Sequence, residues 1–427
     1  MIPVLSVEQL LQRRGAMEVD PEILRRVREI LEDVRRHRDT ALKRWTAELD
    51  GVHVERFRVS QEKLAAAADA ADSAFREALS RAAERIRRYH EAQVRQSWHF
   101  TEANGTLLGQ SVRPLRRVGV YVPGGKAAYP SSVLMNVIPA QVAGVGEVVL
   151  VSPPGRYGVS FPVAVAAHLL GVQEVYAVGG AQAVGALAYG TESIAPVEKI
   201  TGPGNLYVAL AKREVFGHVG IDMVAGPSEV LLVADGSTSP RRAAADMLAQ
   251  AEHDAMASAI LLTPRREWLE EVVRELEKQV ATLPRREVAA QSIRMHGAVC
   301  LVDDLAMAMQ VANRYAPEHL QLLVQDPWRW MPLVESAGAV FLGDYSPEPV
   351  GDYYAGPNHV LPTGGTARFS SPLGVDDFVK RISIVSYSRE ALLQQGEDII
   401  RLARQEGLEA HARSIEVRLE EEGESGE

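Results

Sequence analysis

The sequence predicts an α/β fold in which two α/β units lie side by side, with a helical region before them and a short helical tail after them. From about residue 106, short apolar runs rich in β-branched residues alternate with helical segments. This pattern is typical of a parallel sheet covered by helices on both faces. The alternation continues past residue 239 and contains more strands than one sheet usually holds. We therefore expect two sheets rather than one.

The N-terminal region, residues 1–105, is expected to be helical and to pack on the α/β core. Asp20-Pro21-Glu22 predicts a helix start, with Asp as the N-cap and Pro at the first helical position. Apolar residues then recur at helical spacing. Residues 60–98 predict a second long amphipathic helix. Neither helix carries a pattern that indicates chemistry.

The first α/β unit, residues 106–235, has glycine-containing turns after three of its strands. In open parallel sheets, ligands bind beyond the carboxyl ends of the strands, and the N–H groups at a helix start suit phosphate. The GxGxxG fingerprint of dinucleotide sites is absent. A bound nucleotide and purely structural tight turns therefore both remain open. The predicted strands are residues 118–122, 147–151, 174–178, 198–200 and 229–233, and the predicted helices lie around 134–145, 162–170, 181–189 and 206–216.

The second α/β unit, residues 236–380, repeats the alternation, and a tail of residues 381–427 follows it. The tail predicts one strand and a polar helix pair, which is too short to bury much surface against itself. We expect this pair to dock elsewhere, on a second subunit. The predicted strands are residues 258–263, 298–302, 319–324, 339–342 and 381–387, and the predicted helices are 239–253, 265–281, 304–314, 328–336, 389–406 and 408–421.

Composition and charge exclude several classes of function. The net charge is −10, and the arginines are interspersed with acidic residues, so we expect no nucleic-acid partner. No apolar run approaches the ~20 residues that a membrane helix needs, and the N-terminus lacks the order of a signal peptide. A cytoplasmic protein without membrane contact is the expectation.

The single cysteine, Cys300, lies in the short apolar run GAVCLVDD. One cysteine permits no intramolecular disulfide and no CxxC metal site. A reactive thiolate needs partial exposure and an electropositive setting. We therefore expect Cys300 to be a small core residue, which argues against thioester chemistry.

The segment Gly351–Thr363, GDYYAGPNHVLPT, concentrates polar side chains between closely spaced glycines and prolines. That punctuation predicts a loop without helix. Asp352 and His359 are both candidate metal ligands in it. The alternative is a structural Ω-loop with solvated polar groups.

Three further pairs of polar residues are candidates for chemistry, and each also has a plain structural interpretation. Gln250 and His253 are three residues apart, on one face of a helix end. Glu318 and His319 begin a predicted strand and form a candidate acid/base pair, although adjacent strand residues point to opposite faces. A joint role there needs an irregular backbone. The alternatives are a surface Glu and a half-buried His at the strand start, and ordinary surface positions for Glu406 and His411 near the C-terminus.

Taken together, these stretches resemble the histidinol dehydrogenase family. The matching blocks occur in the family's order over nearly the whole chain, and none departs from the family at a position that we expect to be functional. They are YVPGG (121–125), VGGAQA (178–183), GPGN (202–205), IDMVAGPSEVL (221–231), QAEHD (250–254), APEHLQ (316–321), GDYYAGPNHVLPT (351–363) and EGLEAHARS (406–414).

The resemblance implies a pair of incomplete Rossmann-like units in an intertwined homodimer with a swapped C-terminal tail. It implies the NAD-dependent, four-electron oxidation of L-histidinol through the aldehyde to L-histidine, with one zinc per subunit. It selects Asp352 as the metal ligand of the 351–363 segment and leaves His359 beside it. The implied zinc ligands are Gln250, His253, Asp352 and His411, the acid/base residues Glu318 and His319, further substrate contacts Ser228 and Glu406, and NAD-site residues Tyr121, Gln182 and Asn205.

Physical chemistry gives these residues distinct expected roles. Oxidation of an aldehyde needs a nucleophile, and with Cys300 in the core, water is the expected one. We expect Glu318 to activate that water and His319 to take the hydroxyl proton. Zinc is expected to bind the imidazole and amine nitrogens of the substrate and to orient it. The alternatives are a zinc- and NAD-dependent dehydrogenase of another polar alcohol, a zinc hydrolase and a nucleotide-binding protein without catalysis.

Overall fold

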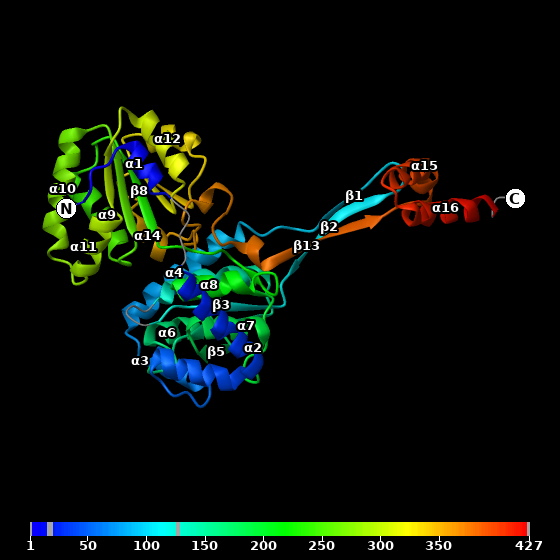
Figure 1. The fold of residues 1–427 in the computed structure, drawn as a ribbon, viewed down its shortest axis with the longest axis horizontal. Coiled ribbons are helices and arrows are strands. Elements are labelled where there is room, and N and C mark those ends of the chain that lie inside the picture. The colour runs from blue at the N-terminus through cyan, green and yellow to red at the C-terminus, as the bar shows by residue number, and fades with distance from the viewer. Residues whose placement is uncertain (1, 15–19, 125–128, 425–427) are drawn as a thin grey trace. The chain divides into compact units, whose positions relative to one another are not determined.

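The computed structural model describes residues 2–14, 20–124 and 129–424. The chain forms two compact units (Figure 1). The core unit comprises the chain up to Gln93 together with Leu115–Phe378, and the tail unit comprises Val94–Pro114 together with the chain from Val379 on. Two parallel sheets covered by helices make up the core unit, so the predicted α/β fold class is confirmed.

The first sheet has the strand order β5-β4-β3-β6-β7, and every pair in it is parallel. The middle positions of its central strands are buried and mostly apolar because helices cover both faces. Its strands are β3 (Arg117–Tyr121), β4 (Glu147–Ser152), β5 (Glu174–Ala177), β6 (Lys199–Thr201) and β7 (Gly220–Ile221), and its helices are α5 (Pro130–Ala143), α6 (Phe161–Leu169), α7 (Gly180–Tyr189) and α8 (Leu206–Val215).

The N-terminal helices form an outer layer on both faces of the first sheet. Helix α2 (Pro21–Asp50) packs on α7 and α8, while α3 (Gln61–Ala70) packs on α6 and α4 (Ser73–Glu91) on α5. The helix start predicted at Asp20 is confirmed, because the Asp20 carboxylate accepts a hydrogen bond from Glu22 N–H at 2.8 Å. The single helix predicted over 60–98 is wrong. It breaks after Ala70, where Asp72 caps a new helix through Phe75 N–H.

The second sheet has the strand order β10-β9-β8-β11-β12, again with parallel pairs. Helix α11 was not predicted, and the helix expected over 328–336 is only a short turn of α-helix followed by a 3-10 turn. The strands are β8 (Glu229–Ala234), β9 (Ser258–Thr263), β10 (Ala298–Leu301), β11 (His319–Leu323) and β12 (Ala339–Leu342), and the helices are α9 (Pro240–Ala251), α10 (Arg266–Val280), α11 (Arg286–Met295), α12 (Leu305–Tyr315), α13 (Pro327–Trp330) and α14 (Glu348–Tyr353).

The beginning of the chain packs on the second sheet rather than on the first. Val4 pairs with Val299 of β10, and Leu5 N–H donates to the Val299 carbonyl at 3.0 Å. Helix α1 (Val7–Gln12) follows and places Leu10 in the apolar cluster beneath α12. The N-terminal segment therefore extends the second sheet at its β10 edge.

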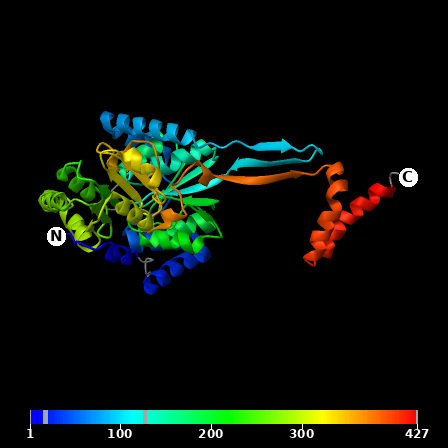
Figure 2. The same cartoon turned by 90° about the horizontal axis from the view of Figure 1, so that it is seen from above.

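The tail unit is a three-stranded antiparallel sheet joined to a helix pair (Figure 2). Strands β1 (Trp98–Thr101) and β2 (Leu107–Pro114) were not predicted, although the intervening Asn104-Gly105 is a hairpin signal. The predicted strand 381–387 is confirmed as β13 (Val379–Ser386), which pairs with β2. The two predicted tail helices are confirmed as α15 (Arg389–Gln405) and α16 (Glu409–Glu424).

An ion-pair network around the buried Arg117 lies at the amino end of the first sheet. The Arg117 guanidinium donates to both carboxylate oxygens of Glu174, at 2.7 and 2.9 Å, and to Glu147 at 2.5 Å. The Tyr176 hydroxyl donates to Glu174 at 2.7 Å. The hydrogen bonds from Arg117 lower the pKa of Glu174 to about 2. The ionised carboxylate is therefore the form that the fold stabilises.

We expect Glu174→Gln to destabilise the protein in a pH-dependent way. An unfolded Glu has a pKa of about 4.3, so the stabilisation by Glu174 is present above that pH and is lost as the pH falls toward 2. At pH 7 the loss is expected to be about 1–2 kcal/mol, since the carboxylate is partly exposed. Thermal unfolding at pH 7 and pH 3 measures this loss of stability. The difference in stability between wild type and variant should be smaller at pH 3. Glu77→Gln, at an exposed ion pair, is the control. An equal difference in stability at both pH values would contradict the prediction.

Candidate functional site

The predicted NAD-site residues lie at the carboxyl edge of the first sheet. Tyr121 ends β3, Gln182 lies in α7 directly after β5, and Asn205 caps α8 directly after β6. The Tyr121 hydroxyl accepts a hydrogen bond from Gly180 N–H at 3.1 Å. Because the carboxyl ends of parallel strands share one edge, the fold brings these residues to a common edge.

Gln182, like Ser152 at the end of β4 and Thr201 at the end of β6, has side-chain polar atoms at this edge that are buried and unpaired in the described part of the chain. Its side chain is buried, yet neither its amide nitrogen nor its amide oxygen has a hydrogen-bond partner among the described residues. An unpaired buried amide costs free energy. A ligand with donors and acceptors at this edge would satisfy it, so the edge fits a polar cofactor.

The acid/base candidates lie at the amino ends of the strands of the second sheet, whereas the predicted NAD-site residues lie at carboxyl ends. Glu318 directly precedes β11 and His319 begins it, beside Glu229 at the start of β8. Glu229 N–H donates to Glu318 Oε2 at 2.8 Å, and His319 Nδ1 lies 2.9 Å from the Glu229 carbonyl oxygen. Both side chains are buried, with exposed fractions of 5% and 3%, and Nδ1 lies 3.7 Å from Glu318 Oε2.

This arrangement excludes the alternative of a surface Glu and a half-buried His at residues 318 and 319. It also meets the condition of an irregular backbone at this point. Ala316 has a φ of +50°, in the left-handed region that non-glycine residues rarely adopt. Two and three residues later, Glu318 and His319 both contact the backbone of the same residue, Glu229.

The hydrogen bond at Nδ1 fixes the tautomer of the neutral His319 ring. A carbonyl oxygen only accepts, so Nδ1 carries the hydrogen and Nε2 carries the free lone pair. The Gln250 amide nitrogen lies farther from Nδ1, at 3.3 Å, and does not compete. Nε2 is buried without a hydrogen-bond partner among the described residues and lies 3.8 Å from Asp352 Oδ1. The ring therefore presents a base to the space beside Asp352.

Burial shifts the pKa of both acid/base candidates. Burial raises the pKa of Glu318 well above its usual range, and the carboxylates of Glu229 and Asp352 add to the rise. The Glu229 N–H and the Ser228 side chain act in the opposite sense. Burial lowers the pKa of His319. A carboxyl group with a raised pKa and a neutral imidazole are the states that proton transfer near neutral pH requires.

A group of potential metal ligands adjoins His319. His253, just after α9, and Glu348 and Asp352 of α14 place one ligand atom each within 4.8 Å of one another. Glu348 and Asp352 are four residues apart and share one face of α14. The hydrogen-bond network assigns the Gln250 amide nitrogen to the side that faces Glu348. In this orientation it donates to the two Glu348 carboxylate oxygens at 2.9 and 3.1 Å.

This nitrogen and oxygen donor set fits a zinc ion. Three of the four predicted zinc ligands, Gln250, His253 and Asp352, are thus brought to one place in the core unit. Glu348 was not predicted. Burial and the nearby carboxylate of Asp352 raise its pKa well above the usual range. The only sequence signal for it was its spacing of four residues from Asp352.

The expectation that Gly351–Thr363 contains no helix is wrong for its first residues, because α14 extends to Tyr353. Proline is tolerated in the first turn of a helix. Gly351 is required for packing, since a Cβ there would lie 2.6 Å from Cε1 of Phe341. The expectation of a loop is confirmed for residues 354–363, where Gly356, Pro357 and Pro362 lie outside any helix.

The rest of the 351–363 segment is anchored to α5. The Asn358 amide donates to the Met135 carbonyl at 2.6 Å. His359 Nδ1 lies 3.0 Å from the Asp352 backbone carbonyl oxygen, and its Nε2 lies 3.4 Å from the Ser132 hydroxyl. Both ring nitrogens of His359 thus have partners in the protein, and the ring holds the backbone of Asp352.

Glu406 and His411 lie in the tail unit. Glu406 caps the C-terminus of α15, and His411 lies in the first turn of α16. Both side chains are exposed in the single chain.

Cys300 lies in β10 and is fully buried. Burial raises the pKa of its thiol to about 11, so the thiol stays protonated near neutral pH. The expectation of a core residue is confirmed.

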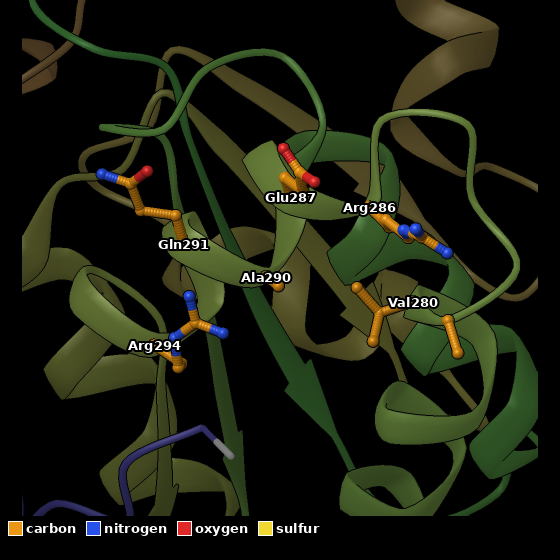
Figure 3. Close-up of a pocket in the computed structure, with 7 residues that line it drawn as sticks. Val280, Arg286, Glu287, Ala290, Gln291 and Arg294 are labelled. Atoms are coloured by element: carbon orange, nitrogen blue, oxygen red, sulfur yellow. The ribbon is translucent and has the colours of Figure 1, made fainter.

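A separate cavity of about 410 Å³ lies between α10 and α11 (Figure 3). Its lining includes the charged Arg286, Glu287 and Arg294 and the apolar Val280 and Ala290. None of the site residues described above lines this cavity.

The fold and the site define a two-sheet α/β protein with a candidate cofactor edge on one sheet and a candidate metal and acid/base centre on the other. The sequence model of the histidinol dehydrogenase family matches residues 12–419. The chain belongs to the histidinol dehydrogenase family.

Individual relatives agree with the family match. A histidinol dehydrogenase from Halalkalibacterium halodurans is 57% identical over 398 residues, which cover 93% of this chain and 94% of the relative. One from Geobacillus kaustophilus is 55% identical over 410 residues, 96% of each chain. The crystal structure of histidinol dehydrogenase from Elizabethkingia anophelis matches this fold with a TM-score of 0.93 at 35% identity, covering 99% of both chains.

Proposed function

We propose that the chain is a zinc- and NAD-dependent dehydrogenase that oxidises L-histidinol through the aldehyde to L-histidine in histidine biosynthesis. The observation that carries the proposal is the placement of Glu318 and His319 on the backbone of Glu229, with His319 Nε2 facing the His253, Glu348 and Asp352 group. This arrangement supports a role for His319 as a base and for Glu318 as a second proton-transfer group beside the substrate.

The chain's own residues have separate tasks in this reaction. His319 takes the hydroxyl proton of the substrate at Nε2, because Nδ1 is bound to the Glu229 carbonyl. Glu318 takes a proton from the water that attacks the aldehyde carbon. Ser228, at the start of the same edge, and Glu406 contact the substrate. NAD supplies the hydride acceptor for both steps.

Gln250, His253 and Asp352 are the residues of the core unit that would hold zinc, and His411 of a second chain would complete the set. Bound there, zinc would provide a positively charged anchor for the imidazole and amine nitrogens of the substrate. We place NAD at the edge formed by Tyr121, Gln182 and Asn205, whose unpaired Gln182 amide supports a polar ligand.

We further propose a homodimer with exchanged tails and a cytoplasmic location. The tail unit exposes apolar side chains on β13 and its helices, including Val385 at 69% and Leu402 at 68%. Such exposure in a small unit is typical of a surface covered by a partner. Among the described residues, no helix is both long and apolar enough to pass through a bilayer.

Purified protein is expected to form NADH from L-histidinol and NAD⁺ and to lose this activity on treatment with a chelator. Added zinc should restore the rate, because the ligands of the core unit remain in place. Cys300→Ala is the control and should stay active, since the buried thiol takes no part. No NADH with zinc present would contradict the proposal, and turnover of another polar alcohol in preference to histidinol would identify the alternative dehydrogenase.

A further inference from the structure

The turn after β6 has an unusual backbone held in a narrow space. Gly202 has a φ of +113°, and a Cβ at this position would lie 2.0 Å from the Tyr121 carbonyl oxygen. The turn therefore packs directly on the backbone of Tyr121 and leads, three residues later, into the Asn205 cap of α8. Both neighbours are residues of the proposed NAD site.

Two buried charged side chains hold this one glycine. The Lys212 ammonium, in α8, donates to the Gly202 carbonyl at 2.9 Å. Asp222, directly after β7, accepts from Gly202 N–H at 2.8 Å. Lys212 and Asp222 also form an ion pair with each other, and their side chains are only 3% and 1% exposed.

Stability alone is a weak reason for such a pair. Removing two charges from water costs several kcal/mol per ion, and a buried ion pair often adds nothing net over apolar residues of similar volume. The pair does fix the orientation of the backbone, because it binds both the N–H and the C=O of Gly202. The two peptide groups that flank Gly202, in the turn that leads to Asn205, therefore have a fixed orientation before any ligand binds.

We propose that Lys212 and Asp222 are positioning residues for NAD, which hold the 202–205 turn in the shape that the dinucleotide requires. This inference rests on the proposed function. Neither residue needs to touch the cofactor, since both act through the backbone of Gly202. Asp222 also accepts a hydrogen bond from the N–H of the next residue, Met223, at 2.6 Å.

The test is the affinity for NAD in a double variant, Lys212→Met with Asp222→Asn, which leaves no unpaired charge in the interior. We expect its Kd for NAD, measured by calorimetry on the zinc-loaded protein, to rise at least about tenfold, and its KM for histidinol to change by less than about twofold. The single variant Lys212→Met, which leaves Asp222 unpaired, should show the same weakening with a larger loss of thermal stability.

Glu174→Gln is the matched control, because its network lies at the amino end of the same sheet. It should lower the thermal midpoint without changing the Kd for NAD. The inference is overturned if the folded double variant binds NAD as wild type does, or if Glu174→Gln weakens NAD equally. If wild type itself binds no NAD, the proposed function fails, and the inference fails with it.

Discussion

Glu318→Gln is expected to yield one NADH per histidinol where wild type yields two. His319 remains on the Glu229 carbonyl in this variant, so the hydroxyl proton still has an acceptor and the first oxidation proceeds. The amide of Gln cannot take a proton from water, so the oxidation of the aldehyde is expected to slow by about 10²–10⁴-fold. His319→Asn should slow both oxidations by a comparable factor, because no base faces the hydroxyl.

The measurement is the ratio of NADH formed to histidinol consumed in a single turnover, with trapping of the aldehyde. His168→Asn, at an exposed position on α6, is the matched control and should retain the wild-type ratio of two. A Glu318→Gln protein that releases two NADH at the wild-type rate would show that another group activates the water. If this variant slowed both oxidations equally, Glu318 would serve the first oxidation as well as the second, and the separate role proposed for it would be wrong.

The second large effect is expected from mixing two inactive proteins. His319→Asn removes the base of the core unit, and His411→Asn removes the predicted metal ligand of the tail unit. If tails are exchanged, a mixed dimer has one site with both changes and one intact site. Random exchange of subunits should then restore about a quarter of the wild-type activity, while each variant alone stays near background.

The mixture is to be assayed after reversible dissociation, beside each variant treated in the same way. His319→Asn mixed with Asp352→Asn is the control, because both residues belong to the core unit and no intact site can form within it. If the His319 and His411 variants fail to complement under conditions that exchange subunits, His411 serves its own chain. Recovery in the control pair would show that the assay reports something other than tail exchange.

The pattern of the sequence was sufficient for the two parallel sheets, because their strands are nearly continuous apolar runs between helices. It was insufficient for the tail sheet. Strand β1 is exposed along its whole length, so no burial pattern marked it, and its Asn-Gly turn was the only local signal. The helix break after Ala70 was hidden for a related reason, since an Ala-rich stretch has helical spacing on both sides of the break.

The site residues came from matched motifs, and their geometry did not follow from local patterns. The general expectation places ligands at the carboxyl ends of strands, and Tyr121 and Asn205, the proposed NAD-site residues, lie at such ends. Glu318 and His319 lie at the amino end of the second sheet instead. The contact that unites them runs through the backbone of Glu229, which no side-chain pattern indicates. Glu348 was missed because a lone carboxylate beside two prolines is common on protein surfaces.

The pairing of Val4 with Val299 has a consequence for how the protein is made. The segment around Val4 pairs with a strand that lies some 300 residues later in the sequence, so this segment stays unpaired until that strand has been made. Contacts of such long sequence separation form late and slow folding. A bulky tag placed directly before Ile2, whose side chain is buried among the helices of the second sheet, should therefore lower the yield of folded enzyme more than the same tag at the C-terminus.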